Sequence, residues 1–108
     1  MEGGRYHLGD ELPISFITTT AAGVPTAPDL APTFSVYTAS GTKIIDSKKV
    51  PPVDRRAVTG LFGYSQFLGT QFASGKYSVL IKWTIGAFSG KIVETFEIMP
   101  GGDPAGNV

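Results

Sequence analysis

The segment Ala73–Trp83 reads ASGKYSVLIKW and combines a glycine, a tyrosine two residues later, and apolar side chains at every second position. Successive side chains of a strand point to opposite faces, so this alternation predicts a β-strand with one buried face. The predicted buried face carries Tyr77, Val79, Ile81 and Trp83. The other face carries Ser78, Leu80, Lys82 and Thr84.

The rest of the chain has the same character, because glycine and proline recur too often for long helices and Thr, Val and Ile favour strands. Residues 11–20 alternate with Leu12 on the core face, and residues 33–46 predict a hairpin that turns at Ser40-Gly41. The proline-rich residues 21–32 predict a crossing from one sheet to the other. The last two strands are predicted to meet at a turn around residues 86–90, and a short first strand is predicted around Arg5–Leu8. We expect an all-β, antiparallel sandwich of about seven strands.

The alternation also predicts one hydrophobic core, since a strand in a two-layer sandwich buries the more apolar of its two faces. Its predicted members are Phe16, Phe34, Val36, Tyr77, Val79, Ile81 and Phe96.

The order Gly75-x-Tyr77 before an alternating strand resembles the tyrosine corner of immunoglobulin-like sandwiches. The resemblance implies that the Tyr77 ring lies in the core and that its hydroxyl bonds back to residues 69–74. Val79 stands where antibody domains have a cysteine, and Trp83 lies on the penultimate strand rather than the third. The chain therefore resembles the cysteine-free Ig-like sandwiches of phage virion proteins, bacterial surface modules and macroglobulin-type domains.

Composition narrows the range of functions. We expect one domain over residues 1–99 and a flexible tail over residues 100–108. Lys+Arg 9 balance Asp+Glu 9, so no global positive field points to nucleic acid. The sequence has no cysteine, no signal-peptide pattern, and no apolar run near the roughly 20 residues of a membrane helix.

Catalytic and metal-binding patterns are weak. His7 is the single histidine, which makes a Ser-His arrangement improbable. Asp10-Glu11 is a poor cation site, and the odd spacing of Glu94 and Glu97 on one strand places them on opposite faces. We expect no enzyme, no metal and no cofactor.

Three features remain as candidate sites. Gly75, Tyr77 and Trp83 are interpreted as structural, with a sugar- or base-stacking Trp83 as the alternative. A loop around residues 48–56 is expected to present a basic docking patch for an acidic partner, made of Lys48, Lys49, Arg55 and Arg56. Phe88, placed in the last turn, is an apolar candidate for a protein contact.

These features favour a non-enzymatic structural protein that works through protein–protein contacts. We expect a bacteriophage virion component, made in the host cytoplasm, that decorates or accompanies the capsid and contacts capsid or other virion proteins. We expect the isolated protein to be a monomer or weak homo-oligomer whose ends become ordered on the particle. The alternative is a binding module of a bacterial surface protein that recognises carbohydrate. An enzyme is the third possible function.

Overall fold

Seven β-strands in two sheets make up the computed structural model, which describes residues 4–51 and 60–100. The strands are β1 (Gly4–Tyr6), β2 (Glu11–Ile17), β3 (Thr33–Thr38), β4 (Lys43–Lys49), β5 (Leu61–Phe67), β6 (Gly75–Ile85) and β7 (Phe88–Ile98). The described residues contain no helix, and therefore none that could span a membrane. The prediction of an all-β fold is confirmed. Residues 101–108, most of the predicted tail, lie outside the described residues.

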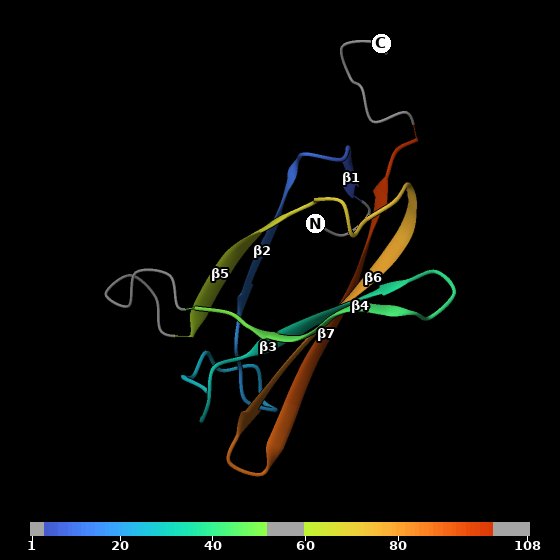
Figure 1. Cartoon of the computed structure of the whole chain (residues 1–108). Helices are drawn as coiled ribbons and strands as arrows, with labels where there is room; N and C mark the ends of the chain where they lie inside the picture. The colour runs from blue at the N-terminus through green and yellow to red at the C-terminus, as the bar shows by residue number, and fades with distance from the viewer. Residues whose placement is uncertain (1–3, 52–59, 101–108) are drawn as a thin grey trace.

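The larger sheet has five strands in the order β1-β7-β6-β3-β4, and the smaller sheet pairs β2 with β5 (Figure 1). All pairs are antiparallel except β1 with β7, which run parallel. The long β6–β7 hairpin is unbroken from Gly75↔Ile98 to Ile85↔Phe88. The connection from β2 to β3, residues 18–32, passes from the small sheet to the large one as the proline-rich sequence predicted.

The predicted boundaries of the last turn and of the first strand are wrong. The hairpin turn contains only Gly86 and Ala87, and Phe88 already pairs with Ile85 in the sheet. Gly86 has a positive φ of 59° while Ala87 does not, which is the pattern of a tight type II′ turn. The first strand covers Gly4–Tyr6 rather than Arg5–Leu8. It ends there because the next four residues form a turn in which the Asp10 amide donates to the His7 carbonyl at 3.0 Å.

The predicted core is confirmed, since all seven of its predicted members are buried in one cluster between the sheets. On β6, Ile81 is fully buried whereas Leu80 is half-buried, so the predicted register holds. The rings of Tyr77 and Phe96 stack with centroids 5.1 Å apart. Fully burying a side chain such as Ile81 contributes about 1.5–3 kcal/mol.

Thr18 directly follows β2 and is fully buried. Its hydroxyl donates to the Thr26 carbonyl at 2.6 Å and contacts the Gly60 carbonyl at 3.4 Å. A Cβ at position 60 would lie 3.0 Å from the Thr18 carbonyl oxygen, and Gly60 has a φ of 81°. Both constraints explain why glycine precedes β5.

Candidate functional site

The tyrosine corner has the geometry that the sequence predicted. The Tyr77 hydroxyl donates to the Ala73 carbonyl at 2.5 Å and accepts from the Ala73 amide at 2.9 Å. Gly75, with a φ of 140°, allows the chain to fold back between these two residues. Tyr77 therefore ties the β5–β6 connection to the core.

Trp83 belongs to the core. Its side chain is 7% exposed, stacks on Phe16 with centroids 6.2 Å apart, and donates its Nε1–H to the Thr19 carbonyl at 3.0 Å. Gly90, directly opposite on β7, lies against the same indole. This burial does not favour the sugar-stacking alternative.

The predicted basic loop is only partly described. Lys48 and Lys49 are the last residues of β4 rather than loop residues, because β4 continues to pair with β3 up to Thr33↔Lys49. Consecutive strand residues point to opposite faces, so the two lysines do not form one patch. Lys48 turns toward the small sheet, where its Nζ lies 4.6 Å from the centroid of the Tyr64 ring. Arg55 and Arg56 lie outside the described residues.

Phe88 is also placed differently from the prediction. It is half-buried as the first residue of β7, so it does not present an apolar turn tip. The exposed apolar residue of this hairpin is Val93, on the outer face of β7, with 59% of its surface accessible.

The outer face of the large sheet, which points away from the core, carries its charges in rows across the strands. The register sets Lys49, Thr33, Lys82 and Lys91 side by side from β4 to β7. At the other end of the sheet, Glu97 lies between Lys76 and Arg5. One row is therefore charge-compensated, and the other has lysines without an acidic neighbour in register.

We call the row of Lys49, Thr33, Lys82 and Lys91 the lysine row. Lys82 and Lys91 are direct cross-strand neighbours, a placement in which like charges repel because the Cβ atoms are only about 4.5–5.5 Å apart. In the described part of the chain, none of the three lysines forms an ion pair within 4.0 Å. The lysine row borders a groove of about 390 Å³, which is also lined by Thr84, Ser89 and the exposed Leu30.

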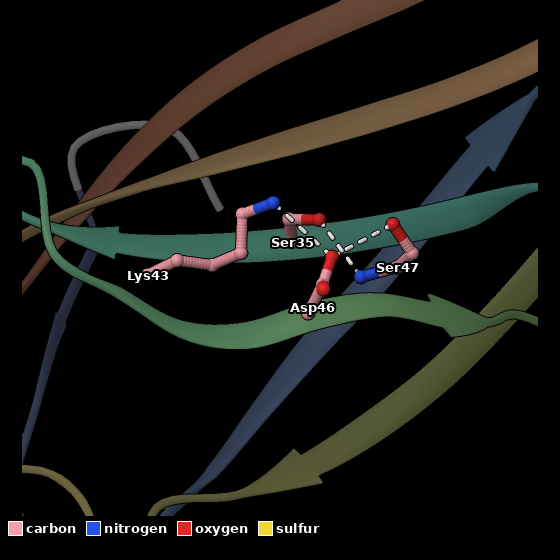
Figure 2. A network of polar contacts seen from close by, with 4 residues as sticks. All are labelled: Ser35, Lys43, Asp46 and Ser47. Atoms are coloured by element: carbon pink, nitrogen blue, oxygen red, sulfur yellow. Dashed lines mark hydrogen bonds and ion pairs between the residues drawn. The ribbon is translucent and has the colours of Figure 1, made fainter.

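A network of polar side chains from β3 and β4 lies at the β4 edge of this face (Figure 2). Asp46 and Ser47 together oppose Ser35, which makes a β-bulge. The Ser47 amide donates to the Ser35 hydroxyl at 2.9 Å, and the Ser47 hydroxyl donates to Asp46 at 3.0 Å. These bonds hold Ser47 at a φ of 51°, a conformation that costs a non-glycine residue roughly 1–2 kcal/mol.

Lys43 completes the network by donating to Asp46 Oδ1 at 3.1 Å (Figure 2). This hydrogen bond, followed by the one from Ser47, lowers the pKa of the Asp46 carboxyl. The same bond to Asp46, followed by the contact with Tyr37, raises the pKa of Lys43. The charge of Lys82 also lowers the pKa of Asp46, but by less than Lys43 does. The carboxylate forms its ion pair with Lys43.

The candidate metal ligands in residues 4–51 and 60–100 are His7 and the Asp and Glu side chains. These residues contain no group of three or more His, Cys, Asp or Glu side chains that could hold a metal ion. Glu94 pairs with Val79 on the core face of β7 and Glu97 with Lys76 on the outer face, so their predicted separation is confirmed. His7 Nδ1 lies 3.9 Å from Asp10 Oδ2 at an exposed turn.

Comparison of the chain with protein-family models, with curated proteins and with solved structures finds no match. The function is therefore inferred from the geometry of the strand edges and of the outer face. Sequence reasoning missed the groove because it needs the pairing of Lys82 with Lys91. Predicting the turn at Gly86-Ala87 would have fixed the register of the hairpin and placed Lys82 opposite Lys91.

Proposed function

We propose that this chain is a non-enzymatic structural protein with an immunoglobulin-like fold that acts through protein–protein contacts. The strand order supports the fold: β7-β6-β3-β4 corresponds to strands G, F, C and C′ of such domains, and β2-β5 to strands B and E. The corner at Tyr77, at the start of the strand equivalent to F, agrees with this assignment.

The observation that carries the proposal is the edge of β7. β1 pairs only with Phe96–Ile98, so among the described residues the stretch 88–95 has a partner strand on its β6 side alone. An unpaired edge exposes backbone N–H and C=O groups that can pair with a strand from another chain. The opposite edge differs, because β4 carries the bulge at Asp46-Ser47, a common device against edge-to-edge pairing.

The proposed partner is a neighbouring protein of a bacteriophage virion, which contributes a strand to the β7 edge. Such an attachment suits a small capsid decoration or accessory protein, made in the host cytoplasm and assembled onto the particle. Val93, exposed beside this edge, would be covered by the added strand. Docking of an acidic partner on Lys48, Lys49, Arg55 and Arg56 stays a prediction.

Hydrogen exchange on the free protein and on purified particles tests the proposal. We expect the amides of residues 88–95 to exchange at least about ten-fold more slowly in particles, which corresponds to about 1.4 kcal/mol of added protection. Residues 43–49 on the bulged edge should exchange equally in both states.

A matched pair of variants separates the edge from the general surface. Val93→Lys places a charge on the proposed contact and should reduce incorporation into particles. Val24→Lys makes the same change at a valine of similar exposure, 55%, in a loop between the sheets, and should leave incorporation unchanged. Equal incorporation of both variants, or unchanged exchange at residues 88–95, would contradict strand addition.

A further inference from the structure

We infer that the groove beside the lysine row binds a tetrahedral oxyanion, a phosphate or sulfate ester, on the outer face of the large sheet. The groove is lined by the side chains of Lys82 and Lys91, by three hydroxyl residues, and by Leu30. The hydroxyl residues are Thr33, Thr84 and Ser89. The groove lies on the face of the sheet beside the β7 edge and shares Ser89 and Lys91 with that strand. The inference does not depend on the proposed function.

The charges of the lysine row favour a bound anion. Lys82 and Lys91 face each other across β6 and β7, and the next residue in the row on β3 is the neutral Thr33. Direct cross-strand pairs of like charge destabilise a sheet, whereas opposite charges stabilise it. An anion between the two ammonium groups would convert this repulsion into two favourable contacts.

The groove is also lined by hydroxyl groups that can donate hydrogen bonds to an oxyanion. The register places Thr84 opposite Ser89, one step along the same face from Lys82 and Lys91. Both hydroxyl residues are exposed, so they are free to donate to a bound oxygen. Ammonium and hydroxyl donors together match the several oxygens of a phosphate or sulfate group.

The shape of the groove favours an ester over a bare anion. Leu30 is 78% exposed and forms one wall of the groove, close to where the Asp29 amide donates to the Thr84 carbonyl at 2.9 Å. The volume of about 390 Å³ exceeds what a bare anion fills and falls within the range of small-ligand sites. An ester with an organic group that covers Leu30 therefore fits better than the inorganic ion.

The same face provides its own control. A second hollow of about 320 Å³ is lined by Arg5, Lys76 and Glu97, and there the acid lies between the two cations. That hollow has a similar size and the same kind of sheet surface but a compensated charge. It should not concentrate anions.

The test is an NMR titration with inorganic phosphate and with inorganic sulfate at constant ionic strength. We expect saturable shifts of the amides of Thr33, Thr84 and Ser89, and weakening by about five-fold or more in Lys82→Gln and in Lys91→Gln, which corresponds to the roughly 1 kcal/mol of an accessible charged contact. Lys76→Gln should change the affinity by less than about two-fold. Equal weakening by all three variants, or shifts that do not saturate, would show diffuse attraction and overturn the inference.

Two further arms identify the ester and check the fold. Glucose 6-phosphate and glucose 6-sulfate are titrated in parallel. If one of them binds more tightly than its inorganic ion, the result supports the site and identifies the ester. If neither binds, the result overturns the inference.

In chloride buffer, Lys82→Gln should raise the urea midpoint by relieving repulsion, and saturating phosphate should cancel that gain. A gain that phosphate does not alter would contradict the inference, because the anion would not lie between the lysines.

Discussion

The contact between Gly90 and Trp83 yields a sharp prediction about stability. In Gly90→Ala, the new Cβ would overlap Cε2 and Cζ2 of Trp83 and lie 2.5 Å from Nε1, where real Cβ atoms essentially never come within 3.0 Å of another heavy atom. The indole cannot simply turn aside, because it stacks on Phe16 and donates to the Thr19 carbonyl.

The expected cost follows from these contacts. Overpacking costs about 1–3 kcal/mol, and a buried N–H that loses its acceptor costs about 1–3 kcal/mol more. The reduced entropy of the unfolded chain returns about 0.4–1 kcal/mol. We expect Gly90→Ala to lower the free energy of unfolding by about 3 kcal/mol, which is a fall of roughly 10–20 °C in Tm for a domain of this size.

Urea denaturation followed by fluorescence measures this directly, because Trp83 is the single tryptophan. A parallel melt by circular dichroism compares Trp83→Leu with the double variant. Leucine lacks all three overlapping atoms, so Gly90→Ala should cost less than about 1 kcal/mol in that background, a coupling typical of residues in contact. A single variant within about 0.5 kcal/mol of wild type, or an equal cost in both backgrounds, would refute the packing argument.

Two other perturbations test the corner and the bulge. Tyr77→Phe should keep the fold and reduce the free energy of unfolding by about 1–2 kcal/mol, because the Ala73 amide and carbonyl lose their partner; denaturant melts that match wild type would mean that the hydroxyl adds nothing. For Asp46, the pKa is lowered on folding, so its contribution to stability is present above the ordinary aspartate pKa and is lost as pH falls through the lowered value. Asp46→Asn should therefore lower the urea midpoint slightly at pH 7, and this difference from wild type should shrink as the pH falls below the usual aspartate pKa of about 3.9. A difference that stays constant over this pH range would exclude ionisation of Asp46 as its source.

Much of the fold could be predicted because period-two alternation is a strong local signal. It placed Tyr77, Val79 and Ile81 on the core face. The Gly75–Tyr77 spacing predicted a hydrogen bond from Tyr77 to residues 69–74, and the structure shows Ala73 as its partner. Both features depend on residues close together in the chain.

Features that depend on pairing between strands were harder to predict. The turn at residues 86–90 was placed too broadly, because Phe88 and Ser89 look like loop residues next to glycines. With the turn at Gly86-Ala87, every β6–β7 pair has residue numbers that add up to 173, and Lys82 then faces Lys91. Lys48 and Lys49 were assigned to a loop because charge and Pro51 suggested one, whereas pairing with β3 extends β4 to Lys49.

The parallel pairing of β1 with β7 has a consequence for synthesis on the ribosome. Gly4 pairs with Phe96, so the first strand waits for a partner that is translated 92 residues later. At about 5–20 residues per second, this delay is on the order of 5–20 s. During that time β2 to β6 can already associate, while the residues of β1 lack the strand with which they pair. The nascent chain therefore completes its large sheet only after the residues of β7 have been synthesised.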